Sequence, residues 1–91
     1  MPFRTLLKLL AENARNFRLA GARTQEDVAH EAGLTVRAYA SIERGQTANP
    51  SLASVHAIAE TLGLDIVDLL QRHDGRAKPP PLKKGRKPRA R

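Results

Sequence analysis

Apolar side chains recur along most of this chain at three- and four-residue spacing, which predicts packed amphipathic helices. In residues 5–20 the stripe consists of Leu6, Leu10, Ala14 and Phe17. Gly21 follows and is expected to end this first helix.

Two short helices are predicted next, and each is bounded by residues that favour helix ends. Thr24 is a good N-cap with Asp27 three residues later, and Gly33 ends the segment. Thr35 begins a third helix that runs to Gly45. At 100° per residue, the pattern assigns an inward face of Ala38, Tyr39 and Ile42, and an outward face of Val36, Arg37, Ala40, Ser41 and Arg44.

A fourth helix is predicted after Ser51, up to Gly63, and a short fifth one after Asp65. The apolar face of the fourth comprises Leu52, Val55, Ile58, Ala59 and Leu62. Prolines and glycines then forbid a continuous helix, and the apolar pattern ends. We therefore expect a folded domain over residues 1–71 and a disordered extension over residues 72–91.

Charge separates the same two segments. Residues 1–71 carry 7 Lys/Arg and 8 Asp/Glu, whereas residues 72–91 carry 9 Lys/Arg and one Asp. The net charges of −1 and +8 agree with the total of +7. A near-neutral body with a basic tail favours a polyanionic partner such as nucleic acid, although a tail that only aids solubility is the plain alternative.

Composition excludes several classes of protein. The chain has no cysteine, so disulfides and thiolate metal sites are excluded. His30, His56 and His73 share no metal-ligand spacing, and we expect no cofactor. No nucleophile–base arrangement or phosphate loop indicates an enzyme. No apolar run reaches the length of a membrane span, and we expect a cytoplasmic protein.

The strongest functional pattern is the pair of helices in residues 24–45. Two short helices joined by a tight turn at Gly33-Leu34-Thr35 are typical of a helix-turn-helix, whose second helix enters the major groove of DNA. Helical spacing alone leaves a purely structural hairpin equally open.

The exact residues of the chain indicate more than helical spacing does. The relevant motifs are Thr24-Gln25-Glu26-Asp27-Val28-Ala29, Gly33-Leu34-Thr35, Ile42-Glu43-Arg44-Gly45, Asn49-Pro50-Ser51-Leu52 and Leu62-Gly63-Leu64. In this order and spacing they resemble the Cro/CI-type (XRE) helix-turn-helix family of transcriptional regulators, over residues 14–70. The resemblance implies an all-α, five-helix, lambda-repressor-like DNA-binding domain.

The resemblance also implies a set of DNA-facing residues. They are Arg23, Thr24, Gln25, Thr35, Val36, Arg37, Ala40, Ser41, Arg44, Gln46 and Thr47. Gln25 matches a phosphate-contacting position, Arg37 is the candidate for guanine, and Val36 for a thymine methyl. Arg18 and Glu43 match a structural ion pair between the first and third helices.

The chain departs from the family pattern at three positions. Arg23 replaces an apolar residue, Tyr39 an aliphatic one and Ala40 a frequent serine. For Arg23, an outward-snorkelling side chain and a phosphate contact both stay open. We expect Tyr39 in the core with its hydroxyl at an edge.

The family usually dimerises through its last helices, which implies a homodimer here. The candidate interface is Leu64, Ile66, Val67, Leu69 and Leu70. The alternative is that all five pack within one subunit.

The tail contains a basic cluster: Lys83, Lys84, Arg86, Lys87, Arg89 and Arg91. Around Gly85 and Pro88 it looks something like an AT-hook, interrupted by Lys87. Minor-groove contact and non-specific phosphate attraction are both open, and both predict strong salt dependence.

These inferences predict a double-stranded DNA-binding transcriptional regulator, a dimeric repressor that recognises an inverted-repeat operator through its third helix. Two other classes compete with it. One is an antitoxin-like module that binds a protein partner and DNA secondarily, and the other is a tail-led, nucleoid-type DNA binder.

Overall fold

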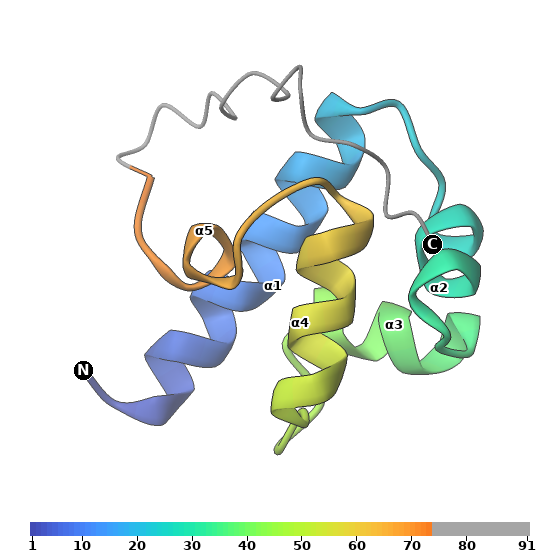
Figure 1. Cartoon of the computed structure of the whole chain (residues 1–91). Helices are drawn as coiled ribbons and strands as arrows, with labels where there is room; N and C mark the ends of the chain where they lie inside the picture. Colours follow the sequence, from blue (N-terminus) through green and yellow to red (C-terminus); the bar gives the residue numbers. More distant parts are fainter. Residues whose placement is uncertain (74–91) are drawn as a thin grey trace.

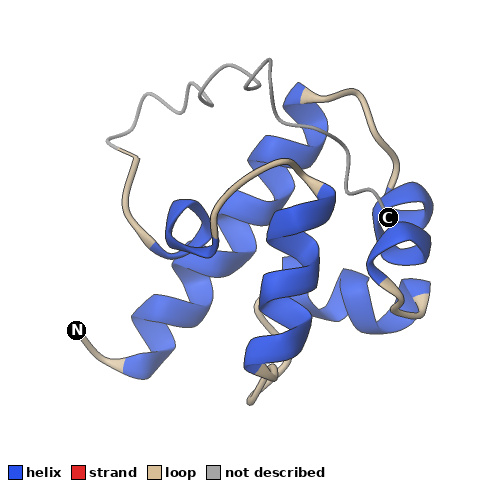
Figure 2. Cartoon of the chain, viewed as in Figure 1, coloured by secondary structure: helices blue, strands red, loops and turns tan. Residues whose placement is uncertain are grey.

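The computed structural model describes residues 1–73, and in this part of the chain it contains helices and no strand (Figures 1 and 2). The helices are α1 (Phe3–Ala20), α2 (Gln25–Ala32), α3 (Val36–Glu43), α4 (Leu52–Thr61) and α5 (Ile66–Leu70). The predicted all-α, five-helix fold is confirmed. The one notable shift in a boundary is that α1 begins at Phe3, after Pro2, and not at Thr5.

The five helices surround a single apolar core that includes the aromatic rings of Phe17 and Tyr39. α4 lies between α5 on one side and α2 on the other, and α1 runs behind it and packs against α5 and α3 (Figure 1). α3 closes the core by packing against α1 and α2. Val28, Tyr39, Ile58 and Leu69 are the largest completely buried side chains of the described residues. Val28, Ile58 and Leu69 each stabilise the fold by roughly 1.5–3 kcal/mol through burial of apolar surface.

Three helices begin at a residue whose hydroxyl caps the helix. The side chains of Thr24, Thr35 and Ser51 each accept a hydrogen bond, 3.0 Å long, from the backbone N–H three residues later. These are the caps that the sequence predicts. At Thr24 the Asp27 carboxylate also accepts from the Thr24 N–H, which completes a capping box.

The last helix corrects the predicted dimer interface. Leu64 and Leu69 are 7% and 0% exposed, so both belong to the core of one subunit. Ile66 and Leu70 are partly buried against that core, and Val67, 58% exposed, is the main outward apolar side chain of α5. The prediction was wrong for Leu64 and Leu69 because a short terminal helix must first cover the open end of its own core.

One member of the predicted apolar face of α4 is also exposed. Leu52 is the first residue of α4 and is 72% exposed, whereas Val55, Ile58 and Ala59 are buried as predicted. The first turn of α4 therefore projects beyond the helices that cover the rest of it.

A buried amide holds the end of α5 against α1. The Asn13 side chain donates to the backbone oxygens of Leu69, at 2.8 Å, and Gln71, at 2.9 Å. Carbonyls at a helix C-terminus lack intrahelical donors, so Asn13 supplies what the helix itself cannot.

His73, two residues beyond the predicted boundary at residue 71, contacts the folded domain. The His73 ring meets the Phe17 ring edge-on, with centroids 5.3 Å apart, and its Nε2 lies 2.7 Å from the Asp68 oxygen. Residues 74–91, with the basic cluster predicted for the tail, lie outside the described residues.

A buried ion pair joins α1 to α3. Arg18 Nε donates to Glu43 Oε2 at 2.6 Å, and Arg18 Nη2 donates to Glu43 Oε1 at 3.0 Å. Both residues are at most 9% exposed. Two parallel donors give the pair a fixed geometry, which a single contact would not.

The ion pair shifts the pKa values of both of its residues. Burial by itself would raise the pKa of Glu43, but hydrogen bonds, from Arg18 above all, outweigh burial and lower it below its ordinary value. The hydrogen bond to Glu43 is the main cause that raises the pKa of Arg18. Both groups are therefore charged at neutral pH.

At the C-terminus of α1, the residue with the left-handed backbone conformation is an alanine. Ala22 has φ of 54°, although the preceding residue, Gly21, has φ of −92°. The N–H groups of Ala22 and Arg23 donate back to the Leu19 and Arg18 oxygens, which holds this turn. A left-handed conformation costs an L-residue roughly 1 kcal/mol, and glycine avoids that cost.

We therefore expect that exchanging the two residues, Gly21→Ala with Ala22→Gly, stabilises the protein by about 1 kcal/mol. A Cβ at position 21 would meet its nearest atoms at 3.7 Å, an ordinary contact. Because composition is unchanged, the entropy of the unfolded chain is nearly unchanged as well. Urea denaturation of the wild type and the double variant measures the gain, and a loss of stability would show that the turn has another conformation.

Acid should weaken the fold through Glu43. Because folding lowers the pKa of this group, its contribution is complete above the ordinary value of 4.5 and is lost as pH falls through the lower, folded value. Glu43→Gln should cost up to about 3 kcal/mol at pH 7. It should also reduce the further loss of stability between pH 5 and pH 3. Glu12→Gln, which removes an exposed carboxylate of α1, is the matched control. If Glu43→Gln leaves the acid loss of the wild type unchanged, the pair does not contribute as described.

Candidate nucleic-acid interface

The turn between α2 and α3 has the predicted form. Gly33 adopts φ of 79° and ends α2, and the Leu34 N–H donates back to the Ala29 oxygen at 2.8 Å. Thr35 then caps α3. Leu34 packs against the core from this turn, so α2 and α3 are held at a defined angle by both backbone and side chain.

The outward face of α3 differs from the prediction at two alanines. Ala38, which was assigned inward, is exposed, and Ala40, which was assigned outward, is only 8% exposed. The inward arc runs instead through Tyr39, Ile42 and Glu43. Because Glu43 must reach Arg18 of α1, the helix is rotated relative to the face that hydrophobicity alone indicates. Ala40 thus lies in the core and offers almost no surface to DNA.

The remaining predicted residues of α3 do lie at its surface. Val36 is 43% exposed, Arg37 is exposed, and Ser41 is partly exposed. All three are on the first two turns of α3, beyond the Thr35 cap. An exposed guanidinium at this place can reach a base edge with two parallel donors, as guanine requires.

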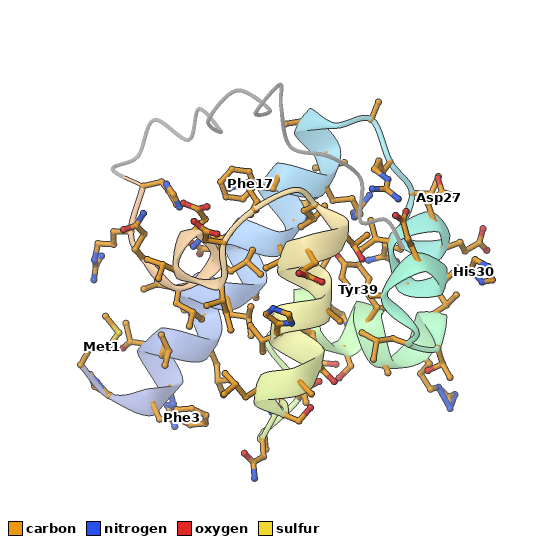
Figure 3. All side chains as sticks on the ribbon, viewed as in Figure 1. Met1, Phe3, Phe17, Asp27, His30 and Tyr39 are labelled. Atoms are coloured by element: carbon orange, nitrogen blue, oxygen red, sulfur yellow. The ribbon has the colours of Figure 1, made fainter. Side chains whose placement is uncertain are left out.

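Tyr39 is more deeply buried than the sequence indicates. Its side chain is 0% exposed, in the interior that Figure 3 shows between α3 and α4, and its hydroxyl has no hydrogen-bond partner within ordinary geometry. The prediction that the hydroxyl reaches an edge was therefore wrong. Burial first, and then the neighbouring Glu43 carboxylate, raise the pKa of Tyr39 far above its ordinary value.

Three residues that were predicted to face DNA form hydrogen bonds with Ser41, near the end of α3. They are Arg44, Gln46 and Thr47. Thr47 Oγ1 donates to Ser41 Oγ at 2.8 Å, and Arg44 Nε donates to Gln46 Oε1 at 3.0 Å. Gly45, with φ of 69°, reverses the chain so that the Gln46 N–H reaches the Ser41 oxygen at 2.9 Å. The loop is thereby folded back onto α3, and its polar side chains adjoin the helix face.

The N-terminus of α2 supplies a second polar surface. Thr24 uses its hydroxyl as the helix cap, and Gln25, the first residue of α2, donates from Nε2 to Glu43 Oε1 at 2.9 Å. The sequence analysis missed this bond between Gln25 and Glu43. No local pattern signals a contact between residues 18 positions apart. Asp27 and His30 of the same helix project outward (Figure 3).

Arg23 is engaged within the protein. Its Nη1 donates to the Thr61 oxygen at 3.0 Å, its Nη2 forms an ion pair with Glu31, and its own backbone oxygen accepts from Arg18 Nη1 at 2.9 Å. These contacts tie the α1–α2 loop to α2 and to the C-terminal end of α4. They support a structural role for Arg23, and a phosphate contact by this residue stays a prediction.

Other functional chemistry is sparse in residues 1–73. This part of the chain has no group of three or more His, Asp or Glu side chains that could hold a metal ion. His30 and His56 are exposed, and His56 lies 3.7 Å from Glu60. None of the described helices has the length and apolarity needed to span a membrane.

Comparisons with known proteins agree with this geometry. A helix-turn-helix family model matches residues 15–69, well over half of the chain. A crystal structure of a hypothetical transcription factor, NHTF, from Neisseria is similar with a TM-score of 0.70 and 30% identity, over 78% of this chain and 82% of the other. No sequence among the curated proteins matches the chain.

A second crystal structure, of the clp gene regulator ClgR from Corynebacterium glutamicum, has a TM-score of 0.67. Its identity is 23%, over 71% of this chain and 68% of the other, which supports the fold alone. The family match, together with the turn, the caps and the outward face of α3, shows that the chain belongs to the XRE-type helix-turn-helix family of DNA-binding transcription regulators.

Proposed function

We propose that this protein is a sequence-specific regulator that binds double-stranded DNA through α3, as a dimeric, non-catalytic repressor in the cytoplasm. The observation that carries this proposal is the exposed surface of α3. Val36, Arg37 and Ser41 are presented on a helix whose other face is completely occupied by the core. The capped start of α3 keeps this surface rigid, which base recognition requires.

The charges of the described residues support separate roles for α3 and for the basic tail. Arg18 and Arg23 are used inside the protein, which leaves Arg37 and Arg44 as the cations on α3 and its C-cap. Few phosphates can be neutralised by such a surface. We propose that the tail cations supply most of the attraction to DNA, and that α3 supplies the selectivity.

The proposed dimer uses the outward face of α5. Val67 is the exposed apolar side chain there, flanked by the partly buried Ile66 and Leu70. A two-fold contact around this face would pair two copies of α3 for half-sites about one helical turn of DNA apart.

The first test is selection of binding sites from a random duplex pool with the full-length protein. We expect an inverted repeat. Arg37→Ala should lower discrimination at the cognate base pair by about 1–3 kcal/mol. Arg15→Ala, which removes an exposed arginine from α1, is the charge-matched control and should leave discrimination unchanged.

Two results would contradict parts of this proposal. Discrimination that survives Arg37→Ala would remove Arg37 from the recognition surface. Failure to enrich any sequence, with a second protein that copurifies in fixed ratio, would favour the antitoxin-like alternative over a DNA regulator.

The tail is tested by salt dependence. Replacing Lys83, Lys84, Arg86, Lys87, Arg89 and Arg91 by Gln should flatten the slope of log K against log salt by up to about 5, since each neutralised phosphate contributes about 0.9. Fluorescence anisotropy at several salt concentrations measures the slope, and the selected sequence should stay the same. Equal binding to every sequence before the substitutions, and none after them, would instead support the tail-led alternative.

A further inference from the structure

Glu43 is shared by three helices. Its Oε1 accepts from Arg18 Nη2 of α1 at 3.0 Å and from Gln25 Nε2 of α2 at 2.9 Å, and Glu43 itself is the last residue of α3. Its Oε2 is occupied by Arg18 Nε. An ion pair that served only to join α1 to α3 would not need the contact with Gln25.

The contact determines which way the Gln25 amide faces. An ionised carboxylate only accepts hydrogen bonds, so Nε2, and not Oε1, must point toward Glu43. The ionised form is ensured by Arg18, which lies on the same carboxylate. The second N–H of Nε2 and the Oε1 of Gln25 are then available away from Glu43, and the side chain is partly exposed.

Gln25 lies at a helix N-terminus, a place that favours anions such as phosphate. It is the first residue of α2, and the first N–H groups of a helix have no intrahelical acceptor. Thr24 Oγ1 accepts from the Asp27 N–H, so the capping hydroxyl is directed at the third residue of the helix. An amide with a fixed direction at this end of α2 would add a donor to those of the backbone.

We propose that Glu43 is a positioning residue for DNA binding, which orients the side-chain amide of Gln25 toward the DNA backbone in addition to pairing with Arg18. This inference rests on the proposed function. It assigns to a buried carboxylate, which DNA cannot touch, a role in affinity that is separate from its role in stability.

A double-mutant cycle separates the two roles. Gln25→Ala should weaken DNA binding about threefold to tenfold, equally for all sequences, as expected for one hydrogen bond. The salt dependence should not change, because glutamine carries no charge. Glu43→Gln should weaken binding by a similar factor in the wild type and have no further effect in the Gln25→Ala background.

Conditions and a control keep the cycle interpretable. Binding is measured where circular dichroism shows every variant to be completely folded. Asn13→Ala removes a different buried polar contact, between α1 and the end of α5, and should lower stability while leaving DNA affinity unchanged. If Glu43→Gln weakens binding as strongly in the Gln25→Ala background as in the wild type, the inference is overturned.

A second measurement needs no DNA and no destabilised variant. In NMR spectra of the full chain, a side-chain amide proton of Gln25 should exchange with water more slowly than those of the exposed Gln71. Equal exchange would overturn the positioning role, whatever the binding results. Slow exchange in a protein that binds no duplex would refute the proposed function and the role in DNA binding with it.

Discussion

The buried carboxylate of Glu43 has to be neutralised where it lies, and the arrangement of the helix-turn-helix follows from how this is done. An unpaired charge in this position would cost several kcal/mol. Arg18 therefore reaches it from α1, and Gln25 reaches it from α2. Since Glu43 ends α3, the three contacts fix the rotation of the recognition helix relative to both earlier helices. That rotation decides that Ala40 is buried and that Arg37 and Ser41 face outward.

The rest of the domain keeps this centre rigid. Hydroxyl caps at Thr24 and Thr35 determine where α2 and α3 begin, and Gly33 allows the sharp turn between them. Arg23 holds the α1–α2 loop to the end of α4, and Asn13 holds the end of α5 to α1. A chain this short buries little apolar surface, so such polar contacts contribute a larger share of its stability than in a large domain.

The use of arginines for contacts within the domain leaves fewer positive charges on its surface. Arg18, predicted as part of a structural ion pair, and Arg23, predicted to face DNA, both hold helices together. Residues 1–71 have a net charge of −1, and residues 72–91 carry a net charge of +8. Under the proposed function, electrostatic attraction and base recognition would reside in different parts of the chain.

Much of the fold could be predicted from the sequence because its signals are local. A capping hydroxyl, a helix-ending glycine and an apolar stripe each act within a few residues, and they correctly located five helices and three caps. The family motifs also predicted α3 as the recognition helix, which stays a prediction. What only the tertiary structure decided involves residues far apart in the chain: the Gln25–Glu43 bond, the use of Arg23 on Thr61, and the burial of Leu64 and Leu69. Periodicity gives the shape of an apolar face, but the direction of that face depends on which partners the neighbouring helices present, and this becomes defined only when the helices pack.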